Sequence, residues 1–416
     1  MTPEIKHRIG QIRRGEVPEG YVKKRKVVIP QQWGLPQIKD IASISSGSTP
    51  NRNNSEYWNG NIAWVTTGEL SSGHVNHTSE LITVKAVKET KMRIYPQGTL
   101  LIAMYGQGKT RGTVAILEID AAVNQACAAI TVKDGKSKFL FYQLKNSYQD
   151  IRKLSNTGNQ ENLNADIIKT YQVPWAPDEE QERISTILTT QDKVIELKEK
   201  RLAEKQRQKK YLMQQLLTGK KRLPGFYGAW SFPKAKELFQ SVSDKDHNGD
   251  LAVLSSTQDR GIVPRDEVDI DIKYDACSLV NYKKVSKGNF VISLRSFQGG
   301  IEYSTYTGLV SPAYTVLSSR KEISDGYYKQ FFKSTDYINR LNVAVYGIRD
   351  GKQISYEDFG RLRIPYPPIK EQNAIAEALS AADREIDLLR QDIEQEKQKK
   401  KALMQLLLTG IARVKT

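Results

Sequence analysis

One stretch of sequence, VPWAPDEEQERISTILTTQDKVIELKEKRLAEKQRQKKYLMQQLLTG, runs from Val173 to Gly219 and decides the fold because it occurs twice. The second copy, IPYPPIKEQNAIAEALSAADREIDLLRQDIEQEKQKKKALMQLLLTG, runs from Ile364 to Gly410. Equivalent residues of the two copies lie 191 positions apart, with no gap. Internal repeats fix the architecture of a chain. A period this long indicates a duplicated half-protein and not a solenoid.

Each copy is predicted to form one long helix. Each opens with a Pro-rich segment, contains neither Gly nor Pro over residues 178–218 or 369–409, and stops at a glycine. Proline is tolerated in the first turn of a helix, and glycine is the favoured left-handed cap after the last turn. Forty-odd residues rising about 1.5 Å each give a helix about 60 Å long. Such a length is typical of a coiled coil.

Apolar residues recur in each helix at steps of four and three, and each seam carries a charged patch about two-thirds of the way along. A long helix with one apolar seam needs a partner helix, and the nearest candidate is the other copy. We therefore expect an antiparallel pair with a globular domain at each end; the alternative is two unrelated surface helices. The residues predicted to form the helix seam and partner contacts are Glu180, Gln181, Ile184, Leu188, Ile195, Leu202, Leu212 and Leu216 in the first copy, and Glu371, Gln372, Ile375, Leu379, Ile386, Ile393, Leu403 and Leu407 in the second.

The remaining sequence divides into two domains with the same plan. We expect an N-terminal helix and link over 1–32, a first domain over 33–173, the first long helix and its link over 174–229, a second domain over 230–364 and the last helix over 365–416. Short β-type runs at 98–104 and 126–132 parallel runs at 288–294 and 312–317, and a helix is predicted after each set, at 138–154 and 327–341. The predicted fold class is α+β: two mixed α/β domains joined by two antiparallel helices with pseudo-twofold, circular symmetry.

Composition favours an anionic partner. The 416 residues carry a formal net charge of +16, with a pI of about 9.5, which is typical of nucleic-acid binding. No apolar run is long enough to span a bilayer, and residues 1–6 lack the apolar core of a signal peptide, so we expect a cytoplasmic protein. The cysteines, Cys127 and Cys277, are too few for a disulfide framework. The four histidines are scattered, so no metal site is expected.

Gly-rich and polar loops supply the candidate DNA contacts. Two loops that follow matching strands combine Arg, Gln and an aromatic ring, and Arg and Gln can pair with guanine and adenine edges in the major groove. Two further polar loops precede the long helices. Ordinary polar hairpin loops are the alternative interpretation for each. The candidate DNA-binding residues are Tyr105, Gln107, Lys109, Arg111, Asn159 and Gln160 in the first domain, and Arg295, Phe297, Gln298, Arg349, Lys352 and Gln353 in the second. A run of ten basic residues over 198–222 is a further candidate, although a solvated helical face explains it as well.

Sequence motifs of catalysis are missing. The chain has no P-loop lysine motif and no glycine fingerprint after a clear first strand, and Tyr366-Pro367-Pro368 lacks the acidic or amide residue that amino-methyltransferases place before their prolines. One nuclease-like pattern, Pro177-Asp178 with Glu196-Leu197-Lys198, lies on a single predicted helix. Its acidic groups would be roughly 27 Å apart at about 1.5 Å per residue, so they cannot share one Mg²⁺.

Taken together, these motifs resemble the specificity (S) subunit of type I restriction-modification systems, over essentially the whole chain. The most specific are Pro-x-x-Glu-Gln-x-x-Ile at 177–184 and 368–375 and the Leu-Leu-Thr-Gly helix ends. The Trp-x-x-Pro domain starts, at Trp33 and Trp230, and the turn Ser46-Gly-Ser-Thr-Pro50 are less specific, and the second domain lacks that turn.

The resemblance implies a non-catalytic DNA-recognition subunit. Each target recognition domain would bind half of a bipartite, asymmetric sequence in double-stranded DNA. The helices would fix the spacer and dock two methyltransferase (modification) subunits, which use S-adenosylmethionine. ATP-driven restriction subunits would join them, so S-adenosylmethionine, ATP and Mg²⁺ would bind those partners and no cofactor would bind this chain. The alternatives are a coiled-coil structural adaptor for proteins or anionic surfaces, and an enzyme that carries its own nuclease.

Overall fold

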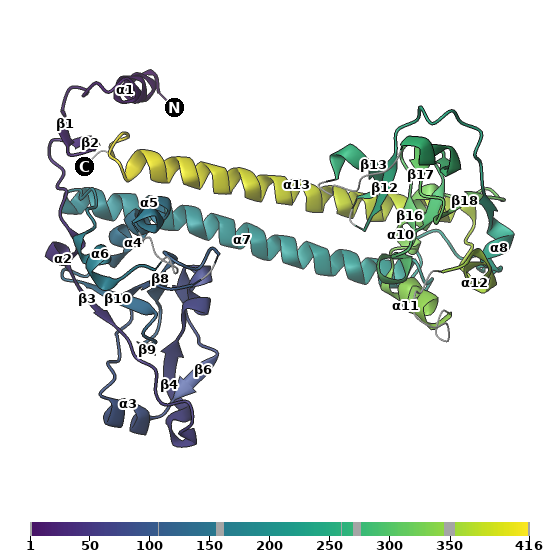
Figure 1. Ribbon diagram of the computed structural model, residues 1–416. Helices are drawn as coiled ribbons and strands as arrows, with labels where there is room; N and C mark the ends of the chain where they lie inside the picture. Colours follow the sequence, from purple (N-terminus) through teal and green to yellow (C-terminus); the bar gives the residue numbers. More distant parts are fainter. Residues whose placement is uncertain are drawn as a thin grey trace. The chain divides into compact units, whose positions relative to one another are not determined.

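The computed structural model describes residues 2–106, 108–154, 162–258, 260–268, 276–344 and 354–414. The chain forms two compact units: Met1–Leu197 together with Ile393–Thr416, and Lys198–Asp392. Each unit therefore contains one globular domain, part of one long helix and part of the other. Figure 1 follows the chain through both units by colour.

Unit 1 is built on a five-stranded sheet in the order β3-β10-β7-β8-β5. Strands β3, β10, β7 and β8 are antiparallel to their neighbours, and β5 is added in parallel beside β8. The strands of this sheet are β3 (Ala42–Ser46), β5 (His74–Val75), β7 (Leu100–Ala103), β8 (Val114–Leu117) and β10 (Cys127–Val132). The helices that accompany this sheet, besides the long pair, are α1 (Pro3–Arg13), α2 (Ile38–Ile41), α4 (Ser137–Asn146), α5 (Tyr148–Lys153) and α6 (Ala165–Thr170).

A second sheet in unit 1 forms what we call the β4 lobe, at the bottom of Figure 1. Its strand order is β6-β4-β9, with β9 parallel and β6 antiparallel to β4. The lobe consists of the 3-10 helices η1 (Ser55–Tyr57) and η2 (Thr67–Ser72), β4 (Trp58–Val65), β6 (Glu80–Ile82), α3 (Val84–Thr90) and β9 (Ala121–Val123).

Unit 2 repeats the main sheet of unit 1. Its four-stranded antiparallel sheet has the order β11-β18-β15-β16, which corresponds strand by strand to β3-β10-β7-β8. The strands of unit 2 are β11 (Phe239–Val242), β12 (Leu254–Thr257), β13 (Gly261–Pro264), β14 (Lys283–Val285), β15 (Phe290–Ile292), β16 (Glu302–Tyr303), β17 (Gly308–Val310) and β18 (Thr315–Ser319). Its helices outside the long pair are α8 (Ala235–Leu238), η3 (Arg265–Glu267), η4 (Ala276–Asn281), α9 (Ser296–Gly299), α10 (Asp325–Phe331), α11 (Thr335–Ala344) and α12 (Tyr356–Arg361).

Three local features differ from the sequence prediction. The single helix expected over 138–154 is two helices, α4 and α5, with a break at Ser147. The helix expected over 327–341 is likewise divided into α10 and α11. The link within 1–32 contains an antiparallel hairpin, β1 (Tyr21–Lys24) with β2 (Val27–Pro30). The Tyr21 hydroxyl donates to the carbonyl of Gly410 at 2.6 Å, so this hairpin covers the end of the last helix.

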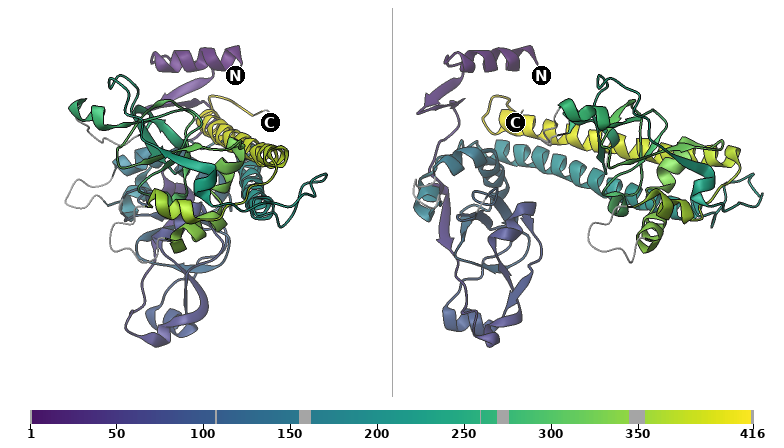
Figure 2. Two further views of the ribbon diagram at one scale, coloured as in Figure 1. Left: turned by 90° about the vertical axis from the view of Figure 1, so that its right-hand side faces the viewer. Right: turned by 45° about the vertical axis from the view of Figure 1, so that its right-hand side comes forward.

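The two long helices are α7 (Asp178–Leu216) and α13 (Ile369–Leu407), each of 39 residues, as the absence of Gly and Pro predicts. Both are followed by glycines in the left-handed conformation, Gly219 at φ 72° and Gly410 at φ 71°, which is the expected cap. The helices lie side by side in both views of Figure 2.

Ion pairs and hydrogen bonds show that the helices run antiparallel in each unit. In unit 1, Glu180 near the start of α7 pairs with Arg413, just after α13, at 2.6 Å. Further along α7, Gln191 donates to Glu396 at 2.6 Å, so the number of the contacted residue falls as the α7 number rises; Asp192 also pairs with Lys400. In unit 2, Lys205 lies 2.8 Å from Glu385. The remaining pairs of unit 2 follow the same antiparallel order: Lys198 with Asp392 at 2.8 Å and Lys209 with Asp383 at 2.5 Å. These contacts occupy the charged patches that interrupt the apolar seams.

Most predicted seam residues are buried, two are partly buried and one is exposed. Leu202 and Leu403 are partly buried, and Leu212 is 37% exposed. Met213 packs against the unit 2 core where the sequence placed Leu212, because 3.6 residues per turn bring position 213 to the inner face between 209 and 216. The buried members of the predicted set are Glu180, Gln181, Ile184, Leu188, Ile195, Leu216, Glu371, Gln372, Ile375, Leu379, Ile386, Ile393 and Leu407.

A buried glutamate ties the start of each long helix to its surroundings. Glu180 accepts the indole N–H of Trp33 at 2.8 Å and pairs with Arg413 at 2.6 Å. Glu371 accepts the indole N–H of Trp230 at 2.9 Å and pairs with Arg222 at 2.5 Å. We call each arrangement a glutamate hub. Each hub joins the first turn of one helix, the start of a domain and the segment after the other helix.

We predict that the substitution Glu180→Gln lowers the free energy of unfolding by about 1–3 kcal/mol, because Arg413 then loses its carboxylate partner. Urea unfolding followed by tryptophan fluorescence measures this change. Glu182→Gln is the matched control, since Glu182 lies exposed on the same helix turn and should shift stability by less than about 0.5 kcal/mol. Equal unfolding midpoints for the two variants would contradict the role of the hub.

Candidate nucleic-acid interface

The loop between β7 and β8 is the first predicted contact region, and the end of α5 anchors it. Arg152 donates to the carbonyl of Gly108 at 2.8 Å and to that of Arg111 at 2.7 Å. The Tyr148 hydroxyl donates to the carbonyl of Lys109 at 2.6 Å. Gly106 and Gly108 take positive φ of 134° and 61°, which glycine adopts without strain. The backbone of this loop is therefore held by α5 at three carbonyls.

The predicted contact residues of that loop fall into two groups. Tyr105 and Lys109 are exposed, whereas Arg111 is only 7% exposed. The DNA contacts assigned to these residues stay predictions. Gln107 lies outside the described residues.

The loop after β15 occupies the matching place in unit 2 and is also held by one cation. Lys333 donates to the carbonyl of Gly299 at 2.9 Å and to that of Gln258 at 3.2 Å, and its ammonium pairs with Glu302. The predicted residues Arg295 and Gln298 are exposed on this loop. A cation from the helical segment after β10 or β18 therefore anchors the equivalent loop in each unit.

The other predicted loop residues are not placed. Asn159, Gln160, Arg349, Lys352 and Gln353 lie outside the described residues, and the same holds for the side chain of Phe297. Their assignment as DNA contacts stays a prediction.

About half of the basic residues over 198–222 pair with acids of α13 within unit 2. Lys198, Lys205 and Lys209 pair with acids of α13, and Arg222 pairs with Glu371. Basic side chains that are already paired with acids contribute less to the binding of an anionic partner. The charge run over 198–222 is thus partly explained by packing within unit 2.

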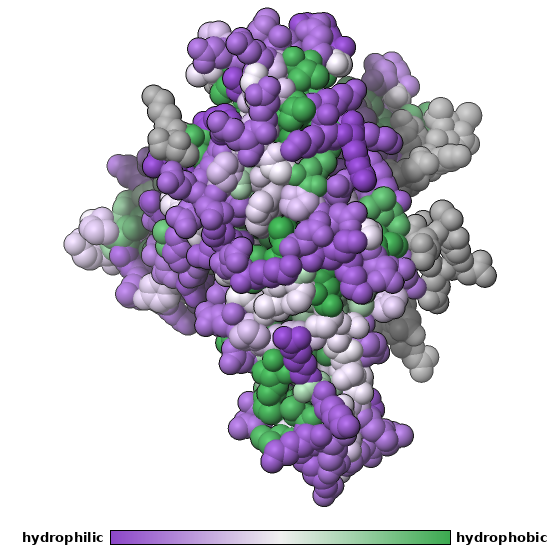
Figure 3. Space-filling model, turned by 90° about the vertical axis from the view of Figure 1, so that its left-hand side faces the viewer, coloured by the Kyte–Doolittle hydropathy of each residue, from purple (hydrophilic) through white to green (hydrophobic). Residues whose placement is uncertain are grey.

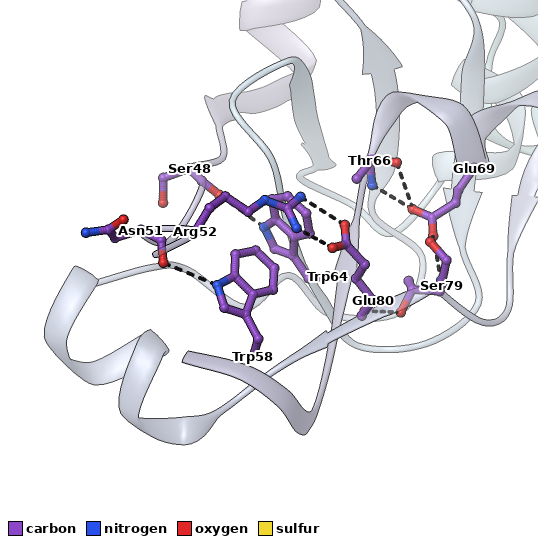
Figure 4. Close-up of polar contacts among 10 residues, drawn as sticks. Ser48, Asn51, Arg52, Trp58, Trp64, Thr66, Glu69, Ser79 and Glu80 are labelled. Carbon is purple, nitrogen blue, oxygen red and sulfur yellow. Dashed lines mark hydrogen bonds and ion pairs between the residues drawn. The ribbon is translucent and has the colours of Figure 1, made fainter. Parts of the chain in front are cut away.

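A polar and aromatic cluster in the β4 lobe was not predicted. The Arg52 guanidinium lies 4.1 Å from the ring centroid of Trp58 and 4.9 Å from that of Trp64. Glu80 accepts from both terminal nitrogens of Arg52, one at 3.0 Å, and this hydrogen bonding lowers the pKa of Glu80. Figure 4 shows these side chains converging from the 48–52 loop, β4 and β6. We call them the Arg52 cluster.

The face shown in Figure 3 is mostly hydrophilic with scattered apolar areas, and one of these lies at the bottom, over the β4 lobe. Over residues 48–95, which contain most of the lobe, the exposed large apolar side chains are Leu81, Val84 and Ile94. The lobe therefore offers both apolar contacts and hydrogen-bond donors.

Features of other site types are missing from the part of the chain that the structure describes. Across residues 2–106, 108–154, 162–258, 260–268, 276–344 and 354–414, no three His, Cys, Asp or Glu side chains gather as metal ligands. Cys127 is fully buried, and desolvation raises its pKa to about 12, so it is no reactive thiol. Of the nuclease-like pattern, Asp178 and Glu196-Leu197-Lys198 lie on one helix, α7, and Pro177 directly precedes it.

Among the described residues, no helix is long and apolar enough to cross a membrane.

The chain is similar to known proteins over nearly its whole length. A protein family described as "Type I restriction modification DNA specificity domain" matches residues 30–207 and again residues 229–398. The putative MjaX specificity subunit of Methanocaldococcus jannaschii is 26% identical over 425 residues, covering 96% of this chain and 98% of that one. The MjaIX specificity subunit of the same organism is 34% identical over 178 residues, which is 41% of this chain and 40% of that one.

A solved structure supports the same fold. The type I restriction-modification S subunit from M. genitalium superposes with a TM-score of 0.55 at 14% sequence identity, covering 93% of this chain and 98% of that one. This similarity concerns the arrangement of the backbone.

We predict that Arg152→Ala loosens the loop between β7 and β8, because the carbonyls of Gly108 and Arg111 lose their donor. Tryptic cleavage after Lys109 should become about tenfold faster, the expected result of losing two hydrogen bonds of about 0.5–1.5 kcal/mol each. Limited proteolysis with mass spectrometry measures this rate. Lys153→Ala is the control, since Lys153 is an exposed neighbour on the same helix, 3.8 Å from Asp150; cleavage at equal rates in both variants would refute the anchoring role.

Proposed function

This chain belongs to the family of type I restriction-modification DNA specificity subunits, and from that premise we propose how it divides its task. Each domain binds one half of a bipartite, asymmetric target in double-stranded DNA. The long helices set the number of base pairs between the halves and dock methyltransferase subunits. The chain itself carries out no chemistry.

One observation carries this proposal: the two halves share a scaffold but present different loops. The order β3-β10-β7-β8 in unit 1 recurs as β11-β18-β15-β16 in unit 2, and each unit has its glutamate hub. The β4 lobe carries a three-stranded sheet, whereas β12–β13 and β14–β17 form two-stranded sheets in unit 2. A common scaffold with different surface loops is expected where two sites must bind different sequences.

The duplicated helices fit a symmetric set of partners. One chain with two equivalent halves offers equivalent surfaces to two copies of one subunit, and we propose two methyltransferase subunits in this role. Leu197 and Leu388, which are repeat equivalents, are 53% and 66% exposed on the two helices. Exposed leucines at matching positions support docking of an apolar partner surface on each helix.

Cofactors belong to the partners in this proposal. S-adenosylmethionine would bind the methyltransferase subunits, and ATP and Mg²⁺ would serve restriction subunits that join the complex.

The second candidate function is a coiled-coil adaptor that binds proteins or anionic surfaces, which the net charge of +16 also favours. Salt-sensitive, sequence-selective duplex binding by the assembled complex separates the two functions.

We expect base-resolved methylation mapping to reveal one split motif in cells that express this chain with its methyltransferase. Cells lacking only this chain should lose methyladenine at that motif, because the methyltransferase then has no sequence-reading partner. Cells lacking only the methyltransferase are the control and should lose the same sites. A methylome unchanged by deletion of this chain would favour the adaptor.

We predict that matched insertions in the two helices lengthen the spacer. Four residues added after Lys205 and four added after Arg384 leave the Lys205–Glu385 and Lys209–Asp383 pairs in register. They add about 6 Å of helix, equivalent to about one or two base pairs at about 3.4 Å each. Methylation mapping reads the spacer directly.

The control for this experiment is the insertion after Lys205 alone. It breaks the register of the ion pairs and should abolish modification. An unchanged spacer in the doubly extended chain would show that helix length does not set the distance.

A further inference from the structure

We propose that Arg52 determines specificity in the first domain and that its guanidinium reads a guanine edge in the major groove of duplex DNA. This inference rests on the proposed function and deepens it by naming a reading residue and the kind of base. It places one reading element in the β4 lobe, outside the loops that the sequence predicted.

The backbone that carries Arg52 is fixed by both tryptophans of the cluster. The indole N–H of Trp64 donates to the carbonyl of Ser48 at 3.1 Å, and that of Trp58 donates to the carbonyl of Asn51 at 3.2 Å. The side chain of Asn51 accepts from the backbone N–H of Asn53 at 3.0 Å. The chain is therefore held immediately before and after position 52.

The carboxylate that holds Arg52 is itself positioned. Glu69 accepts from the backbone N–H of Thr66 at 2.6 Å and from that of Ser79 at 2.7 Å, which fixes the start of β6 beside β4. Glu80, the residue after Ser79, is the carboxylate that accepts two hydrogen bonds from Arg52. Figure 4 shows this series of contacts from Glu69 to Arg52.

Arg52 is held rigidly although it is at the surface. Its side chain is 53% exposed and that of Glu80 is 34% exposed. Exposed ion pairs contribute little to stability, and ordering a long side chain costs rotamer entropy. Two rings and a carboxylate already order Arg52 in the free protein. Binding of a ligand therefore need not cost further side-chain entropy.

The donors left on Arg52 suit a guanine. A guanidinium has five N–H groups in a fixed fork, and Glu80 uses two of them. The commonest specific contact of arginine with DNA is bidentate, to O6 and N7 of guanine. A phosphate oxygen accepts the same donors, so the experiment has to distinguish a base edge from the DNA backbone.

The Arg52 cluster belongs to the first half of the chain alone. The five tryptophans all lie at or before position 230, and the second domain lacks the Ser46–Pro50 turn that leads into the Arg52 loop. An effect of Arg52 should therefore be confined to one half of the target.

The test is methylation mapping with the Arg52→Lys variant in the complete complex with the methyltransferase. Lysine keeps the charge but cannot make the bidentate contact. We expect preference for one G·C pair in one half-site to fall by about tenfold or more, with the other half-site unchanged. Glu80→Gln, which keeps Arg52 and both tryptophans, should weaken preference at the same base pair, and it decides the question if Arg52→Lys does not assemble.

Lys85→Gln is the matched control, because Lys85 forms an exposed ion pair with Glu56 at 2.5 Å in the same lobe. It should leave base preference unchanged. Unaltered preference in Arg52→Lys and Glu80→Gln, or uniformly weaker binding to all duplexes, would overturn the inference, the latter in favour of a phosphate contact. A target in which neither half-site contains a G·C pair would also overturn the inference. Absence of any motif with the wild-type chain would instead refute the proposed function.

Discussion

The rest of the structure depends on a buried carboxylate at the start of each long helix. Glu180 and Glu371 are 1% and 0% exposed, and a charge removed from water in this way needs a cation and hydrogen-bond donors. The cation comes from the segment after the other helix, and a donor comes from the first tryptophan of a domain. No single segment can satisfy the carboxylate. Each glutamate hub therefore forms only when both helices and the domain are together.

Equivalent carbonyls next to the helix ends accept hydrogen bonds from different side chains in the two domains. The Gln143 amide donates to the carbonyls of Pro174 and Leu408, both at 2.8 Å. In unit 2 the Tyr328 hydroxyl donates to the carbonyl of Pro365 at 2.9 Å, and burial raises the pKa of Tyr328, which keeps this hydroxyl a donor. The repeat thus places the same backbone carbonyls, which need hydrogen-bond donors, next to both domains. Each domain meets it with its own side chains.

Sequence predicted the scaffold because the scaffold is periodic. Long runs free of Gly and Pro, closed by glycine, set the bounds of α7 and α13, and repeated β-type runs located the sheet strands. Prediction failed where a single residue or a tertiary contact decides the structure. Stepping by four and three reached Leu212, whereas the helical turn packs Met213 against the unit 2 core, and nothing periodic marks the break at Ser147. The Arg52 cluster was missed for the same reason: two indole N–H groups find backbone carbonyls that only the folded lobe brings near.

The contrast between helices and loops explains how a duplicated chain can bind an asymmetric target. Along the helices, every ion pair depends on register, so a change in one copy requires a matching change in the other. A loop needs only its anchor: Arg152 holds the loop after β7 by two carbonyls, and Lys333 holds the loop after β15 by the carbonyl of Gly299. Carbonyls are present whatever the side chains are, so these loops can differ in sequence without loss of support. Duplication thus fixes the parts that must match, and leaves free the parts that must differ.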